Sequence, residues 1–391
     1  MDALTKYLNR HAEPETYLAR TQQASTNHQY QSALVLPAFD EPPEPIKRTL
    51  EKARAENAIV IAVINCPDTA AAAEIERTRD LFNALTQCQA RHLLMVNRVD
   101  EPIPRRQGVG LARKIGADIA LELFSAGKLV SPWIYSTDAD AVLPDNYFQH
   151  PLGAAGAAVF AHRHHAKDGR LAKAVALYDQ HMAYYVAGLS FAGSRYAMPS
   201  LGSALAIHAH TYAQIRGFPR RAAAEDFYLL NKAVKIAPVE YHPQVVIDIE
   251  ARVSQRVPFG TGPALNKIAE LLDAGQSYNS YDVEVFVQLK HTLAALDRFA
   301  ETGRLVLHEP NLSILQGLGF AARERNFVSA YQPRQRRCAV HDWFDGLRTL
   351  KFVRALAKDL PETPLLPTLK DLPAEMRACM QSHFWGDPNP N

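Results

Sequence analysis

The chain has 391 residues, of which 47% are hydrophobic and 21% are charged, so it can bury a core of ordinary globular size. Its 43 lysines and arginines nearly balance its 41 aspartates and glutamates, which argues against a protein that binds nucleic acid through its overall charge. These values also exclude collagen-like, coiled-coil and disordered chains. We therefore expect one large α/β unit with appendages, or two domains.

The cysteines and the apolar runs bear on the cellular compartment. The four cysteines lie far apart, without the C-x-x-C spacing that is typical of zinc sites. The first thirty residues are polar, and no uninterrupted apolar run reaches the length of a membrane span. We therefore expect a cytoplasmic protein with reduced thiols and no transmembrane segment. Its oligomeric state remains open.

The predicted elements follow a regular order along the chain. Residues 1–30 are expected to form a polar N-terminal extension. From 32 to about 249, short β-branched runs alternate with amphipathic stretches, which predicts a mostly parallel, doubly wound sheet flanked by helices. The expected strands are 33–36, 59–64, 92–96, 133–136, 158–161 and 245–249, and the clearest helices between them are 45–56 and 107–123.

After Pro263 the pattern becomes helical. Residues 265–272 and 283–299 have apolar residues at helical spacing, and prolines then punctuate the tail into short helices and turns. We expect residues 31–262 to form the α/β domain and residues 263–391 to form a helical subdomain or cap.

Two aspartates follow the predicted strand 133–136, in the segment Asp138-Ala139-Asp140. In an extended chain this spacing puts both side chains on the same side, and open α/β sheets bind ligands at the carboxyl ends of their strands. Such a pair can hold Mg²⁺ or Mn²⁺ against a diphosphate. A solvated loop is the alternative, because acidic pairs at this spacing also arise by chance.

Two further elements point to the same edge of the sheet. An acidic turn at Asp40-Glu41 follows the first predicted strand, and its carboxylates can accept hydrogen bonds from a base or ribose, or can cap the next helix. A loop at Gly108 opens a helix that carries Arg113 and Lys114. Helix N-termini and cations attract phosphate, although an exposed cation pair on a solvated face is equally compatible.

The fourth element is the acidic pair Glu225-Asp226 at a predicted helix start, preceded in the sequence by Gly202-Ser203. A carboxylate at the carboxyl edge of the sheet can remove the proton of an acceptor hydroxyl while the hydroxyl oxygen forms a new bond. Helix capping accounts for the same pair without catalysis.

Taken in order, these four elements resemble the family 2 glycosyltransferases with the GT-A fold over residues 32–262. The resemblance implies a nucleotide-diphosphate sugar donor, a soluble or peripheral hydroxyl acceptor, and Mg²⁺ or Mn²⁺. Asp226, with Glu225 beside it, is implied as the general base of an inverting transfer. The resemblance assigns Pro37, Ala38, Asp40, Glu41, Arg113, Asp138 and Ala139 to the donor, Gly202 and Ser203 to the acceptor, and Asp138 and Asp140 to the metal.

The sequence departs from this family in two respects. Many members supply a late histidine to the metal, but residues 253–262 contain none, which leaves His242 or Gln255 as the further ligand. The Gln-x-x-Arg-Trp signature of processive synthases is also absent, so we expect a single transfer for each acceptor.

Two other functions remain open. A sugar-phosphate nucleotidyltransferase would use the same sheet and cation, but such enzymes usually place a Gly-rich basic loop after the first strand, where Asp40-Glu41 stands here. A non-enzymatic nucleotide-sugar-binding protein would use the same site without transfer.

Overall fold

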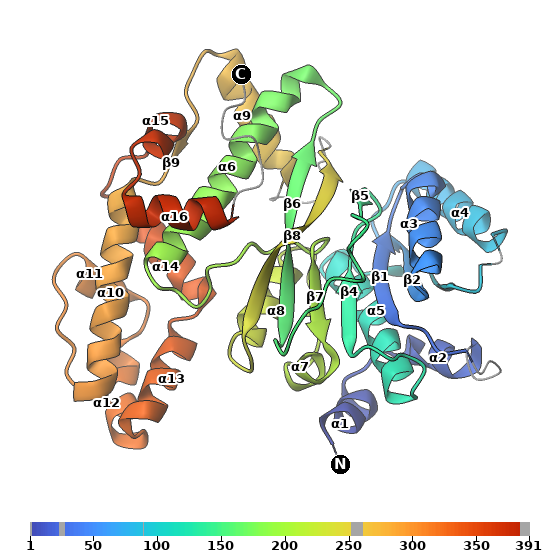
Figure 1. Cartoon of the computed structure of the whole chain (residues 1–391), viewed down its shortest axis with the longest axis horizontal. Helices are drawn as coiled ribbons and strands as arrows, with labels where there is room; N and C mark the ends of the chain where they lie inside the picture. The colour runs from blue at the N-terminus through green and yellow to red at the C-terminus, as the bar shows by residue number, and fades with distance from the viewer. Residues whose placement is uncertain (1, 23–27, 89, 252–260, 384–391) are drawn as a thin grey trace. The chain divides into compact units, whose positions relative to one another are not determined.

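The computed structural model describes residues 2–22, 28–88, 90–251 and 261–383 (Figure 1). The chain divides into two compact units. The first unit comprises Met1–His165 and Ser200–Gly260, and the second comprises Ala166–Pro199 and Thr261–Asn391. Among the helices of the described ranges, none has the length and apolar character needed to cross a membrane.

The first unit is a mixed α/β domain around an eight-stranded, mostly parallel sheet flanked by helices, in agreement with the fold class expected from the sequence. Its strands are β1 Ser32–Ala38, β2 Ala58–Pro67, β3 Leu93–Ile103, β4 Trp133–Ser136, β5 Ala141–Val142, β6 Ala157–His165, β7 Leu205–His208 and β8 Val239–Glu250. Its helices are α1 Ala3–Arg10, α2 Tyr17–Gln22, α3 Pro43–Ala55, α4 Ala72–Thr86, α5 Gly108–Ser125, α7 Ala209–Gln214 and α8 Glu225–Ala233, with a 3₁₀ turn at Pro14–Thr16.

All six expected strands form in this sheet. The sequence did not predict β7, which pairs antiparallel with both β4 and β6 near the middle of the sheet. Its first three residues are all buried, so it lacks the polar and apolar alternation by which a short strand is recognised.

Helices cover both faces of the sheet around β1 and β2. Leu34 of β1 belongs to a core cluster with Ile46 of α3 and Leu81 of α4. Successive strand side chains point to opposite faces, so Val35 faces the other way. There the backbone of α5 lies so close that a Cβ on Gly116 would overlap the Val35 side chain. Helices α3 and α4 therefore cover one face, and α5 covers the other (Figure 1).

The strand order β3-β2-β1-β4-β7-β6-β8-β5 determines which strands meet at the carboxyl edge of the sheet. From β1 the chain moves outward to β2 and β3, and then returns to place β4 on the other side of β1, with all these pairs parallel. The carboxyl ends of β1 and β4 thus flank a topological switch point, where open α/β sheets form a crevice.

The polar N-terminal residues are part of the first unit, because they satisfy buried charges on α5. The hydroxyl of Tyr7 donates to Asp118 at 2.6 Å, and the backbone N–H of Glu13 donates to the same carboxylate at 2.8 Å. Lys114 forms an ion pair with Asp118 at 2.7 Å and donates to the Tyr7 hydroxyl at 2.6 Å. These contacts join the N-terminal residues to α5 within the first unit.

The second unit is largely helical, as expected for the C-terminal part of the chain. Its elements are α6 Gly169–Phe191, α9 Thr261–Asp273, α10 Val283–Thr302, α11 Asn311–Gly317, α12 Ala321–Ala330, α13 Pro333–Trp343, α14 Gly346–Leu356, α15 Leu365–Lys370 and α16 Ala374–His383, with a two-stranded ladder of β9 Asn279–Ser280 and β10 Thr363–Pro364.

Helix α6 lies between β6 and β7 in the sequence, within the expected α/β domain, but it packs with the C-terminal helices. The hydroxyl of Tyr184 donates to the Tyr281 carbonyl at 2.9 Å, and its ring meets Phe286 of α10 edge-on at 5.4 Å. Gly188 provides the space for Phe286, since a Cβ there would overlap the Phe286 ring. The second unit therefore contains Ala166–Pro199 in addition to the C-terminal region.

Candidate functional site

A cavity of about 390 Å³ opens at the carboxyl edge of the sheet, by the ends of β1 and β4. Five segments that are remote in sequence line it: the ends of β1 and β2, the stretch from the end of β3 into α5, the turn after β4, and the segment before α8. The lining residues are Pro37, Ala38, Phe39, Glu41, Asn65, Pro67, Thr69, Ile103, Arg105, Gly108, Val109, Arg113, Asp138, Ala139, Asp140 and Ala222. Three of the four sequence elements thus meet at this cavity.

The Asp138-Ala139-Asp140 segment is a tight turn between β4 and β5. The last sheet contact before it is the Thr137 N–H, which donates to the Val35 carbonyl at 3.0 Å. The Ala141 N–H then closes the turn by donating to the Asp138 carbonyl at 3.2 Å. The turn therefore begins where β4 leaves β1, and its residues line the cavity.

Arg113 lies at the centre of a buried polar cluster beside this cavity. Its guanidinium donates to the carboxylates of Glu225 and Asp138, and its Nε donates to the Ser136 hydroxyl at 3.3 Å. Ser136 in turn donates to the carbonyl of Gly202 at 2.8 Å. Arg113 is 3% exposed and Glu225 is 3% exposed, so this ion pair is sheltered from solvent screening.

The charges in this cluster shift the pKa of each member. Burial raises the pKa of Glu225 to about 7, although the Arg113 charge opposes the shift. Burial also raises the pKa of Asp226, opposed by Arg113 and by hydrogen bonds from the backbone of Phe227 and Gly202. Burial alone would lower the pKa of Arg113, but the carboxylates of Asp138, Glu225 and Asp226 together raise it above its usual range.

One guanidinium thus faces three carboxylates, with carboxyl pKa values displaced toward neutrality. Displaced carboxyl pKa values occur both in catalytic sites and in structural ion-pair networks, and neither Glu225 nor Asp226 is among the residues that line the cavity. The acidic pair does not supply the helix cap, because the N-cap residue of α8 is Ala224; both carboxylates lie in the first turn, where the Phe227 N–H donates to Asp226 at 2.6 Å.

The environment of Arg113 differs from the one that the sequence suggested. We expected its side chain to meet a diphosphate, and it lines the cavity, but its N–H groups donate to Ser136, Asp138 and Glu225. Lys114 is buried as well and pairs with Asp118, so neither cation lies on a solvated face.

The start of α5 also differs from an open phosphate site. The Gly110 N–H donates to the Arg221 carbonyl at 3.0 Å, so this helix N-terminal donor already has a protein acceptor. Gly108 has a φ of +40°, and a Cβ there would overlap the backbone of Ala222. The glycines of this loop therefore allow close approach of the segment around Ala222, which also lines the cavity.

The two residues of the first acidic turn point to different places. Glu41 lines the cavity, whereas Asp40 forms a two-point ion pair with Arg77 of α4, at 2.6 and 2.9 Å. Asp40 has a φ of +53°, a conformation that aspartate tolerates better than most residues.

The expected acceptor residues lie behind the cluster. A Cβ on Gly202 would overlap the guanidinium of Arg113, so only a glycine fits at this position. Ser203 is 2% exposed. Neither residue is among those that line the cavity.

The structure does not bring His242 to the cavity. His242 lies on β8, with its Nδ1 2.9 Å from Nε2 of His150, so its contact is with the β5–β6 connection. Gln255 lies outside the described residues. Among the described residues of the first unit, no three His, Cys, Asp or Glu side chains bring ligand atoms within 4.8 Å of one another. A divalent ion bound here would therefore take most of its ligands from a bound diphosphate and from water, which Mg²⁺ accepts readily.

Sequence reasoning missed several residues of the cavity wall. Asn65 lies near the end of β2, Thr69 follows that strand, and Arg105 follows β3. Each lies at or just beyond the carboxyl end of a parallel strand that the sequence did predict. The signal that would have identified them is position, because parallel strands bring their carboxyl ends to one edge.

No protein-family model matches the sequence, and no curated protein sequence matches it.

Proposed function

We propose that this protein is a metal-dependent glycosyltransferase, which moves a sugar from a nucleotide-diphosphate donor to a hydroxyl acceptor. The observation that carries the proposal is the buried cluster of Arg113 with Asp138 and Glu225, beside a cavity at the switch point of the sheet. The GT-A identity of the domain belongs to the same proposal, supported by the order β3-β2-β1-β4 and by the acidic turn after β4.

The cavity wall has the chemistry that a nucleotide-diphosphate sugar needs. Phe39 offers an aromatic face for a base, and the Asn65 amide offers both a donor and an acceptor. Arg105 lines the same cavity and is exposed, so we assign the contact with the diphosphate to Arg105 rather than to the buried Arg113.

Asp140 is the residue that we assign to the divalent cation, with Asp138 held next to it by Arg113. A carboxylate, diphosphate oxygens and water together make the oxygen-only ligand set that Mg²⁺ and Mn²⁺ prefer. The cation, when bound, would neutralise charge on the departing nucleoside diphosphate.

Asp226 is the residue that we assign as general base. An alcohol is barely ionised at neutral pH, so its attack on the anomeric carbon benefits from a carboxylate that takes its proton. Arg113 stabilises the ionised forms of Glu225 and Asp226, which keeps a base available although burial opposes ionisation. The hydroxyl oxygen attacks the anomeric carbon on the face opposite the leaving group, and this direction of attack inverts the configuration.

The first test is ligand-dependent thermal stability. Nucleoside diphosphates with Mn²⁺ should raise the Tm of the wild type, because a ligand that binds only the native state stabilises it. Asp140→Ala should lose the part of this shift that depends on Mn²⁺. The matched control is Asp100→Ala, an exposed carboxylate paired with Arg79, which should behave as the wild type. A Mn²⁺ response that is unchanged in Asp140→Ala would contradict the metal assignment.

The second test separates transfer from binding. Asp226→Asn should retain the donor-dependent Tm shift but lose sugar transfer, and unimpaired turnover would remove Asp226 as base. Release of pyrophosphate from a nucleoside triphosphate, without release of nucleoside diphosphate from a sugar nucleotide, would instead identify a sugar-phosphate nucleotidyltransferase.

A further inference from the structure

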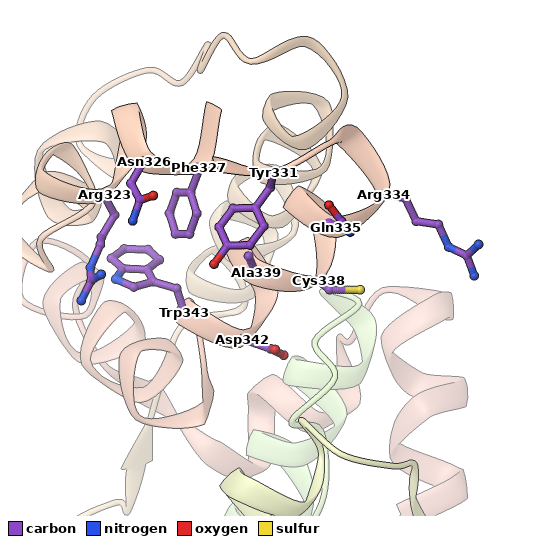
Figure 2. Close-up of a pocket in the computed structure, with 10 residues that line it drawn as sticks. All are labelled: Arg323, Asn326, Phe327, Tyr331, Arg334, Gln335, Cys338, Ala339, Asp342 and Trp343. Carbon is purple, nitrogen blue, oxygen red and sulfur yellow. The ribbon is translucent and has the colours of Figure 1, made fainter. Parts of the chain in front are cut away.

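The second unit contains a separate cavity of about 780 Å³, formed by α12, α13 and the turn between them (Figure 2). It lies wholly within that unit, and none of its residues belongs to the candidate site above. We call it the α12–α13 groove. Its lining residues are Arg323, Asn326, Phe327, Tyr331, Arg334, Gln335, Cys338, Ala339, Asp342 and Trp343.

An aromatic wall forms the inner side of the groove. The rings of Phe327 and Trp343 are nearly perpendicular, with centroids 6.3 Å apart. The guanidinium of Arg348 covers one face of Trp343 at 4.8 Å from the ring centroid. Tyr331, a residue that is 38% exposed, completes the wall, and Figure 2 shows its ring beside that of Phe327.

A buried arginine holds the turn that carries Tyr331. Arg336 is 8% exposed, and its guanidinium donates to the backbone carbonyls of Phe327, Val328 and Tyr331 at 3.1 to 3.4 Å. It also donates to the carbonyl of Ala300 at the end of α10, at 3.3 Å. The groove is therefore fixed before any ligand arrives, which lowers the entropy cost of binding.

The polar side chains of the groove offer both donors and acceptors. Asn326 and Gln335 have amides that can donate and accept, Asp342 can only accept, and Arg323 and Arg334 can only donate. A hydroxyl group both donates and accepts, so a ligand with many hydroxyls can use all of these groups. An aromatic wall beside mixed polar groups also suits a molecule with apolar C–H faces and polar edges.

We propose that the α12–α13 groove binds an oligosaccharide. The exposed ring of Tyr331 would pack against the C–H face of one sugar ring, and Asn326 and Gln335 would bind its hydroxyls. A single-stranded nucleic acid also uses aromatic rings and arginines. The groove instead sets two neutral amides, an aspartate and two arginines beside the ring of Tyr331, a mixture that suits a polyhydroxylated ligand, so we commit to a glycan and make a nucleic acid an outcome of the test. The proposal does not depend on the transfer reaction.

The test uses the full chain, fluorescently labelled, on a printed array of neutral, amino and acidic glycans. The wild type should be retained by a subset of them. Calorimetry with the best-retained glycan should then show a Kd that is about tenfold weaker in Tyr331→Ala and in Asn326→Ala. Tyr17→Ala removes a 56% exposed tyrosine of the first unit and should bind as the wild type does. Equal Tm values for wild type and variants show that folding is unchanged.

The variant Asp226→Asn separates this proposal from the proposed function. It should lose transfer but keep glycan binding, so failure of one does not entail failure of the other. Absence of retention on the whole array would overturn the proposal, as would glycan binding that Tyr331→Ala leaves unchanged. The proposal would also be overturned if the array retained no glycan while the wild type bound a twelve-nucleotide oligodeoxythymidine and Arg323→Ala did not. That result would identify a nucleic-acid groove.

Discussion

A side chain on Gly202 would occupy the position of the Arg113 guanidinium, because an added Cβ would overlap the Cζ of that arginine. Gly202→Ala should therefore displace Arg113 from Asp138 and Glu225. We expect a loss of about 2–4 kcal/mol in the free energy of unfolding, measured with urea, since a buried ion pair is broken. Nucleotide-dependent Tm shifts should fall as well.

The control for this substitution is Gly317→Ala in α11. An added Cβ there meets nothing within 4 Å, so its stability should change by less than about 1 kcal/mol. Similar stability of the two variants would contradict the close packing at Gly202.

Replacing the arginine itself should have a larger effect. Arg113→Met keeps much of the side-chain volume but leaves Asp138 and Glu225 without their cation. We expect destabilisation by about 3–5 kcal/mol, the range for removing one partner of a buried pair. Arg77→Met breaks the pair with Asp40, in which the arginine is 58% exposed, and should cost much less stability than Arg113→Met. Chemical denaturation of both variants provides the comparison, and equal losses would show that the Arg113 pairs are not sheltered.

The raised pKa of Glu225 predicts a pH dependence of stability. Its pKa is raised to about 7 in the folded chain from a usual value of 4.5, so the folded state holds a proton that the unfolded state has lost between these values. The free energy of unfolding should therefore fall as the pH rises from about 4.5 to 7, by an amount of the order of 3 kcal/mol.

Glu225→Gln should remove this part of the pH dependence, so its stability should gain on the wild type as the pH rises. Urea unfolding at pH 5 and pH 8 measures the difference. Glu44→Gln changes an exposed carboxylate and should follow the wild type at both values. If wild type and Glu225→Gln lost the same stability over this range, Glu225 would not be the titrating group.

The attachment of the N-terminal residues can be tested at Asp118. This carboxylate is fully buried and accepts hydrogen bonds from Tyr7, Tyr212 and the Glu13 backbone, in addition to its ion pair with Lys114. Asp118→Ala should destabilise the chain by about 3–5 kcal/mol and expose residues before Glu13 to trypsin. Glu122→Ala, one turn further along α5, removes only the exposed pair with Arg20 and should change stability by less than about 1 kcal/mol. Equal digestion rates for the two variants would contradict this role.

The sequence predicted the fold wherever local pattern and tertiary structure agree. The long apolar runs that became β1 and β2 and the stripe that became α10 could be assigned from periodicity alone. The strand β7 could not, because four residues carry too little pattern and its neighbours β4 and β6 come from other parts of the chain. The sequence also did not show that α6 belongs to the second unit. Apolar spacing indicates that one side of a helix is buried, but it does not identify the elements that bury it.

The site was predicted in part for the same reason. The sequence indicated that Asp138, Asp140 and Glu41 would gather at one edge, because strand ends determine that edge. It did not indicate that Arg113 would donate to Glu225, since that pairing depends on how close α8 comes to α5. Nor did it indicate that Asp40 would turn to Arg77, because a helix cap, a surface ion pair and a ligand contact call for the same residue type.

The membership of α6 has a consequence for how the protein is made. The chain passes from the first unit to the second and back before it enters the second unit for the last time at Thr261. During synthesis, α6 leaves the ribosome about seventy residues ahead of α9 and about ninety ahead of α10. The apolar side of α6 therefore stays unpacked until α9 and α10 have been synthesised. Nascent chains stalled near residue 250 should bind strongly to chaperones that recognise exposed apolar helices.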